Sequence, residues 1–227
     1  MAIRAIVLDF DGVVVESNQI KHQAFSDLFS AYPEFYDQVM EYHRAHNAVG
    51  RHEKFRYIME HIMHEHYSPN LAAEWADEYA RMTREKITKC PYVNGALDMI
   101  TDLNKIIPFY LASATPFDEL SRILSARGIA GIFKEVYGAP MKKAIMLKEI
   151  ARRENAFCGE ILFIGDSRED YISARESGCI FIGRISGYDF HDVPALCFKD
   201  LYEIKAYIVK NLMNGGRDGL SDRIIRA

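Results

Sequence analysis

The chain has 227 residues, of which 49% are hydrophobic and 26% are charged, and its formal net charge is −4. This is the composition of an ordinary globular protein. The mild acidity favours neither nucleic acid nor an acidic membrane surface as a partner. No apolar run approaches the roughly 20 residues of a membrane span, and the N-terminus shows no signal-peptide pattern.

Four cysteines are scattered along the chain and form no CxxC pair: Cys90, Cys158, Cys179 and Cys197. This usage is typical of free thiols in a reducing compartment, and it favours neither a disulfide framework nor a zinc site. We therefore expect a cytoplasmic protein. Nothing in the sequence indicates an obligate protein partner.

Five short apolar runs predict β-strands, at residues 3–10, 109–113, 135–139, 161–165 and 179–182. Continuous runs of this length are typical of parallel strands buried on both faces. Residues 115–128 and 167–178 begin and end with residue types that are typical of helix termini. In the first of these segments, we expect Thr115 as the N-cap and Pro116 at the first helical position. The alternation predicts an α/β protein with a Rossmann-like, doubly wound parallel sheet.

Residues 17–90 interrupt this pattern, because they contain no convincing strand. Leu71, Trp75, Tyr79 and Met82 recur at helical spacing within them. We therefore predict a core made of residues 1–16 and 91–212, a helical domain at 17–90 inserted directly after the first strand, and an unassigned C-terminal tail at 213–227.

Two carboxylates, Asp9 and Asp11, stand at the end of the first predicted strand. Two unit charges about 4 Å apart repel by roughly 4 kcal/mol at an effective dielectric constant near 20. In open α/β sheets, functional groups gather at the carboxyl ends of the strands. The other predicted strands add Ser113, Asp166 and Asp170 there. Such a set of oxygen ligands suits a hard divalent cation, most simply Mg²⁺.

Four ordered motifs, "DFDGVVVES", "LASAT", a lysine in "PMKKAIML" and "FIGDSREDY", resemble those of the haloacid dehalogenase superfamily. The second acid, Asp11, points to the phosphatase and phosphomutase branch, because the dehalogenating members lack it. The helical insertion resembles the cap domain of this family. The resemblance covers both ends of the predicted core.

The resemblance implies a role for each matching residue. Asp9 is expected to be the nucleophile and Asp11 the general acid and base, while Ser113 and a lysine bind the transferring phosphoryl group. Asp9, Asp11, Asp166 and Asp170 are expected to hold Mg²⁺. Gly12 and Ala114 are expected to contact the substrate. An attacking carboxylate would form an aspartyl-phosphate and so divide one difficult step into two.

The lysine motif offers two neighbours, Lys142 and Lys143. Adjacent residues at a helix start project about 100° apart, so only one can face the phosphoryl group. Lys143 lies one turn before Leu147, which belongs to the predicted buried face. We therefore favour Lys143, and we expect Lys142 to lie in the preceding loop.

The segment "HNAVGRHEKFRYI" resembles the specificity loop of related caps. Arg51 and Lys54 are expected to bind the substrate, with His52 and Arg56 as further candidates. The alternative is a solvated helix face. His61, His64 and His66 do not share one helical face, so a zinc site is not expected here.

These observations predict a Mg²⁺-dependent phosphatase that hydrolyses a small phosphorylated metabolite. A sugar phosphomutase with the same site is the first alternative. A non-catalytic acidic pocket that senses phosphorylation is the second alternative, but such modules lack a long helical insertion. We expect neither nucleic acid nor membrane as a partner.

Overall fold

A parallel sheet forms the centre of the computed structural model, which describes residues 3–46 and 49–213. Its strands are β1 (Ala5–Leu8), β2 (Phe109–Pro116), β3 (Glu135–Ala139), β4 (Ile161–Gly165), β5 (Ile180–Arg184) and β6 (Cys197–Phe198). They lie in the order β3-β2-β1-β4-β5-β6. This is the order of a doubly wound Rossmann-like sheet, so the predicted fold class is confirmed.

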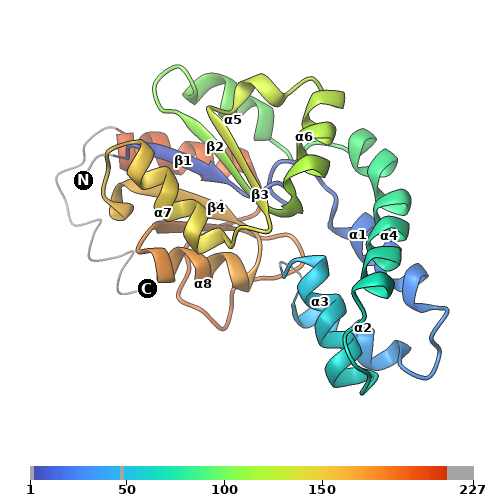
Figure 1. Cartoon of the computed structure of the whole chain (residues 1–227). Helices are drawn as coiled ribbons and strands as arrows, with labels where there is room; N and C mark the ends of the chain where they lie inside the picture. The colour runs from blue at the N-terminus through green and yellow to red at the C-terminus, as the bar shows by residue number, and fades with distance from the viewer. Residues whose placement is uncertain (1–2, 47–48, 214–227) are drawn as a thin grey trace.

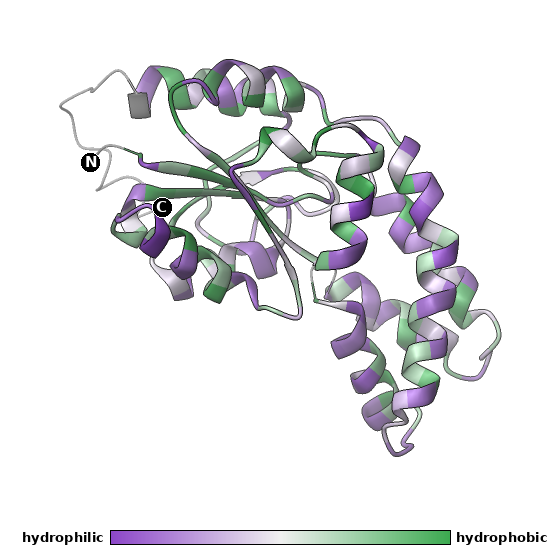
Figure 2. Ribbon diagram, turned by 45° about the horizontal axis from the view of Figure 1, so that its top comes forward, coloured by the Kyte–Doolittle hydropathy of each residue, from purple (hydrophilic) through white to green (hydrophobic). Residues whose placement is uncertain are grey.

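Helices cover both faces of the sheet (Figure 1). One face packs against α5 (Ala96–Leu103), α6 (Phe117–Ala126) and α9 (Leu201–Tyr207). The other packs against α7 (Lys143–Arg153) and α8 (Arg168–Ser177). Because both faces are covered, all four residues of β1 are fully buried. The strands accordingly appear hydrophobic in Figure 2, whereas the helices alternate between hydrophobic and hydrophilic residues.

The described residues of the insertion after β1 form helices joined by loops. It contains α1 (Asn18–Phe29), α2 (Tyr36–Ala45), α3 (Arg51–Tyr57), the π-helical turn η1 (Ile58–Ile62) and α4 (Pro69–Lys89). The insertion buries its own hydrophobic cluster, centred on Phe25, Phe29, Phe55 and Trp75. It projects to one side of the sheet (Figure 1). The division of the chain into domains stays a prediction, and residues 214–227 of the predicted tail lie outside the described residues.

Two details differ from the sequence prediction. Thr115 does not cap a helix, because β2 continues to Pro116, which pairs with Ala139, and α6 begins at Phe117. The Thr115 hydroxyl instead donates to Asp11 at 3.1 Å. The short strand β6 was not predicted, because two residues carry too little hydrophobic pattern to be recognised. Among the described helices, none has both the length and the apolar character needed to cross a membrane.

Candidate active site

The loop after β1 carries Asp9 and Asp11, which are 4% and 8% exposed. Gly12 lets the chain turn here, because its φ of +73° lies in the left-handed region. Arg184 on β5 fixes the turn by donating from Nη1 to the Gly12 carbonyl oxygen at 3.1 Å. The loop therefore holds both carboxylates at the carboxyl edge of the sheet.

Three buried acids meet at this edge. Carboxylate oxygens of Asp9, Asp166 and Asp170 lie within 4.8 Å of one another. Lys143, the first residue of α7, places Nζ 2.9 Å from Asp9 Oδ2 and 2.5 Å from Asp170 Oδ1. Ser167 orients Asp170 by donating from Oγ to Oδ2 at 2.6 Å. The ends of β1 and β4 and the first turns of α7 and α8 thus build one charged cluster.

The cluster holds more negative than positive charge. Burial raises the pKa of Asp9 to about 8; Lys143 opposes this rise, and Asp170 and Asp166 add to it. Burial also raises the pKa of Asp166 to about 6, again with Asp170 adding to the rise. Burial alone lowers the pKa of Lys143, but Asp170 and Asp9 reverse this and bring it above its usual range. A further cation would relieve the remaining repulsion, and three carboxylates are ligands that Mg²⁺ accepts.

Asp11 has different partners from Asp9. Its carboxylate accepts from Ser17 Oγ at 2.6 Å and from Thr115 Oγ1 at 3.1 Å, and it forms an ion pair with Lys21 on α1. Burial on its own would raise the pKa of Asp11, but Lys21, Ser17 and Thr115 together lower it. The structure therefore does not bring Asp11 into the group of three acids, although the sequence analysis assigned it to the metal site.

The predicted lysine and serine occupy different environments. Lys143 is buried in the charged cluster, whereas Lys142 is exposed and stands at the N-cap of α7. Ser113 is fully buried near the end of β2, and its Oγ accepts from the Thr115 amide at 3.1 Å. Its neighbours Ala114 and Thr115 line a cavity over the cluster.

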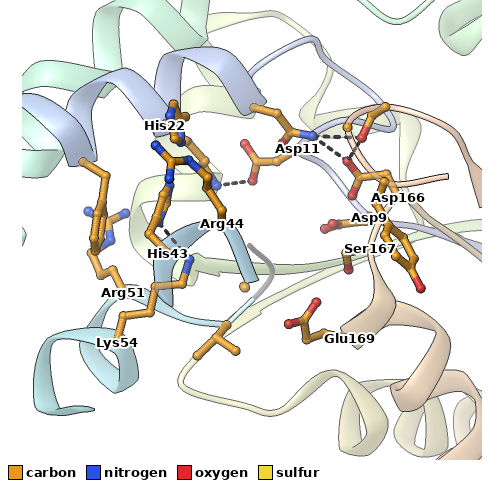
Figure 3. A pocket seen from close by; sticks show the side chains of 18 of the residues that line it. Asp9, Asp11, His22, His43, Arg44, Arg51, Lys54, Asp166, Ser167 and Glu169 are labelled. Atoms are coloured by element: carbon orange, nitrogen blue, oxygen red, sulfur yellow. Dashed lines mark hydrogen bonds and ion pairs between the residues drawn. The ribbon is translucent and has the colours of Figure 1, made fainter. Parts of the chain in front are cut away.

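A cavity of about 650 Å³ lies over the cluster, between the sheet edge and the helical insertion. Arg51 and Lys54 line it from α3, and they are three residues apart on one helical face. His52 and Arg56, the other two candidates, are exposed, and Arg56 stacks on Tyr67 at 4.2 Å. Figure 3 shows the basic side chains of the insertion on one side of the cavity and the acids of the core on the other.

Comparison with known proteins agrees with this arrangement. Residues 3–178 match the haloacid dehalogenase-like hydrolases.

The chain belongs to this family.

The family resemblance noted in the sequence is therefore confirmed. Among curated relatives, the phosphoglycolate phosphatase of Yersinia pseudotuberculosis is 26% identical over 131 residues, 54% of each chain. That of Vibrio parahaemolyticus is 32% identical over 89 residues, 37% of this chain and 39% of the relative. The matches thus span about half of these relatives or less.

Solved structures show the same fold at low sequence identity. β-Phosphoglucomutase from Clostridium difficile has a TM-score of 0.72 and 16% identity, and the match covers 93% of this chain and 97% of that one. CbbY from Rhodobacter sphaeroides, solved in complex with phosphate, has a TM-score of 0.69 and 18% identity. The match covers 89% of this chain and 96% of that one. At these identities, the likeness concerns the fold alone.

The residues that surround the acids in this family member were not predicted from the sequence. Asn18 Nδ2 and Ser186 Oγ donate to Asp166 Oδ2 at 2.5 and 2.6 Å, and Lys21 pairs with Asp11. Ser186 follows β5 by two residues, so the rule about strand ends applied to the fifth strand would have found it. Asn18 and Lys21 lie in the first turns of α1, directly after the loop that carries Asp11.

We expect Gly12→Ala to disable the site of this family member. A Cβ at Gly12 would lie 1.9 Å from Asp166 Oδ2 and 2.4 Å from Asn18 Nδ2. Asp166 must then move, so Mg²⁺ affinity measured by calorimetry should fall by about tenfold or more. Gly128→Ala is the matched control, because Gly128 has a φ of +71° but a Cβ there meets nothing within 4 Å. The left-handed backbone alone should cost each variant about 1–2 kcal/mol of stability, and Gly12→Ala should lose more because of its contacts with Asp166 and Asn18. Equal Mg²⁺ affinity in the two variants would contradict the placement of Asp166.

Proposed function

We propose that this protein is a Mg²⁺-dependent phosphatase that hydrolyses a small phosphorylated metabolite through an aspartyl-phosphate on Asp9. The observation that carries the proposal is the position of the Asp9 carboxylate. It lies beside Lys143 and two further acids and lines the cavity. The Asp9 nucleophile, the Lys143 cation and the Asp166 carboxylate therefore line one cavity. The partial similarity to proteins named phosphoglycolate phosphatase supports the same reaction class.

Asp9, Asp166 and Asp170 are the residues that would hold Mg²⁺, since their oxygens already lie close together and buried. When bound, Mg²⁺ would neutralise negative charge on the phosphoryl oxygens. The same neutralisation would lower the raised pKa of Asp9 and keep its carboxylate ionised. Lys143 and Ser113 would contribute a charge and a hydroxyl donor to the phosphoryl group.

The proposed reaction has two steps. In the first, a carboxylate oxygen of Asp9 attacks phosphorus, and the bond from phosphorus to the ester oxygen breaks. Protonated Asp11 gives its proton to that oxygen, which leaves as an alcohol. In the second step, ionised Asp11 takes a proton from water as the water oxygen attacks phosphorus. The bond between phosphorus and the Asp9 oxygen breaks, which releases inorganic phosphate and regenerates the Asp9 carboxylate.

Asp11 must change its protonation state between these steps. In the structure, Lys21 favours its ionised form, which is the form that the second step needs. A phosphoryl dianion arriving beside Asp11 would raise its pKa and favour the protonated form for the first step. The pair of Asp11 and Lys21 is therefore compatible with both roles.

Hydrolysis of a generic aryl phosphate tests the proposal. We expect sustained turnover with Mg²⁺ and none after chelation with EDTA, and we expect Ca²⁺ to inhibit because its longer, looser coordination misplaces the attack. Release of free inorganic phosphate would distinguish a phosphatase from a phosphomutase, which returns the phosphoryl group to its substrate. Activity that survives chelation would contradict the metal assignment.

Asp166→Ala is expected to weaken Mg²⁺ binding and turnover together, because it removes one of three carboxylates. Mg²⁺ affinity should fall by about tenfold or more in calorimetry. Asp77→Ala is the control, since Asp77 is an exposed acid on α4. A loss of turnover with unchanged Mg²⁺ affinity would show that Asp166 serves another purpose.

We further propose the cytoplasm as the compartment, because Cys90, Cys158, Cys179 and Cys197 are all free thiols. The cavity of about 650 Å³ between the core and the insertion supports a small metabolite as the substrate rather than a macromolecule.

A further inference from the structure

The Asp166 carboxylate is held by donors from two distant parts of the chain. Asn18 is the first residue of α1, and Ser186 follows β5 by two residues. Asn18 Nδ2 lies 2.5 Å from Asp166 Oδ2, and Ser186 Oγ lies 2.6 Å from the same oxygen. Asn18 Nδ2 also lies 3.2 Å from Ser186 Oγ. The insertion, the end of β4 and the loop after β5 therefore meet in one small network at the acidic cluster.

This network uses its hydrogens consistently. The Asn18 amide nitrogen has two hydrogens, and it donates one to Asp166 and one to Ser186. The Ser186 hydroxyl accepts from Asn18 and donates its own hydrogen to Asp166. An amide turned the other way would place its oxygen against the carboxylate. The network therefore fixes which way the Asn18 amide points.

Asp166 differs in its partners from the other two acids of the cluster. Lys143 pairs with Asp9 at 2.9 Å and with Asp170 at 2.5 Å. Asp166 is instead held by two neutral groups, an amide and a hydroxyl, which orient its carboxylate without cancelling its charge. A cation that enters the cluster would therefore find in Asp166 a ligand that is both oriented and charged.

Both donors contact the same oxygen of Asp166. Oδ2 accepts from Asn18 and Ser186, so Oδ1 can bind a cation without the loss of either hydrogen bond. Gly12 leaves the room for this arrangement, since a Cβ there would lie 1.9 Å from Oδ2 and 2.4 Å from Asn18 Nδ2. Carboxylates that bind metals are commonly oriented by such hydrogen bonds from residues outside the coordination sphere.

We propose that Asn18 and Ser186 are positioning residues for Mg²⁺: they hold Asp166 Oδ2 and thereby direct Oδ1 toward the ion. Both act through Asp166 and not as ligands of the ion. This inference rests on the Mg²⁺ site of the proposed function and adds that the helical insertion contributes to that site through Asn18. Mg²⁺ affinity consequently depends on how the start of α1 is placed against the core.

Mg²⁺ affinity in the absence of substrate tests the role of each donor. Asn18→Leu has a side chain of similar shape but no donor, and Ser186→Ala removes the hydroxyl. We expect each variant to weaken Mg²⁺ binding in calorimetry by about tenfold, and the double variant to weaken it further. Ser186→Thr keeps a hydroxyl, so its Mg²⁺ affinity should stay within about threefold of that of the wild type.

The matched control is Asn70→Leu, because Asn70 is also an exposed asparagine in the first turn of a helix, α4, but lies outside the cavity. Asn18 and Ser186 are exposed, so their variants should fold, as circular dichroism would show. If the heat of Mg²⁺ binding is too small, Mn²⁺, which also prefers oxygen ligands, reports the affinity by electron paramagnetic resonance. Wild-type affinity in both single variants would overturn the proposal.

Kinetics separates the positioning of Asp166 from contact with the substrate, since Asn18 and Ser186 both line the cavity. With an aryl phosphate, Asn18→Leu should raise the Mg²⁺ concentration for half-maximal turnover by about tenfold. This factor should exceed any change in KM for the ester at saturating Mg²⁺. A raised KM with unchanged Mg²⁺ affinity would overturn the proposal, because it would mean that Asn18 contacts the substrate.

Binding also separates this inference from the proposed function. Weaker Mg²⁺ binding by Asn18→Leu and Ser186→Ala supports the positioning role even if the wild type hydrolyses no phosphate ester. Equal Mg²⁺ affinity in the wild type and these variants overturns the role even if turnover requires Mg²⁺.

Discussion

Asp9→Asn is expected to lower kcat for an aryl phosphate by at least about a thousandfold, because an amide cannot attack phosphorus. Asn is nearly isosteric with Asp, and it replaces a carboxyl group whose ionisation is disfavoured by burial and by the two neighbouring acids. The free energy of unfolding should therefore be unchanged or increased, as chemical denaturation would show. A folded variant that retains more than about a hundredth of the wild-type rate would contradict the role of Asp9.

Lys143→Ala is expected to reduce kcat/KM by about 3 kcal/mol or more in transition-state free energy, which is more than about a hundredfold. Its Nζ contacts both Asp9 and Asp170, so no other described lysine can replace it without moving the helix. Lys142→Ala is the matched control. Lys142 is exposed, so its removal should change kcat/KM by less than about 1 kcal/mol.

Steady-state kinetics at saturating Mg²⁺ would provide this comparison. If Lys143→Ala unfolds, Lys143→Met retains an apolar stem of similar length near Phe163, whose ring centre lies 6.0 Å from the lysine Nζ. The reverse ranking of the two lysines would show that the phosphoryl group approaches from the side of the exposed loop, and it would refute the geometry proposed here.

Much of the core was predictable from the sequence, because its strands carry strong local signals. β1 and β4 are continuous apolar runs followed by Asp9 and Asp166, and parallel strands bring their carboxyl ends to one edge. The start of α7 at Lys143 was predicted because Leu147, on the predicted buried face, lies one turn later. The roles of these residues stay predictions until kinetics test them.

The contacts between the insertion and the core were not predictable in the same way. Lys21 forms an ion pair with Asp11, and Arg51 forms one with Glu119, so both pairs join the insertion to the core. Arg51 and Glu119 are 68 residues apart, and Lys21 and Asp11 lie in different elements, so no periodicity links either pair and both depend on how α1 and α3 sit against the core. For this reason, the sequence suggested that Arg51 binds substrate, whereas in the structure Arg51 forms an ion pair with Glu119 of the core.

The stereochemistry of phosphoryl transfer tests the aspartyl-phosphate most directly. A phosphorothioate ester made chiral with oxygen isotopes is hydrolysed in isotopically labelled water, and the configuration of the released thiophosphate is determined. Each in-line displacement inverts phosphorus, so attack by Asp9 followed by attack by water predicts overall retention. Overall inversion would mean that water attacks the substrate in a single step, and it would contradict a covalent intermediate on Asp9.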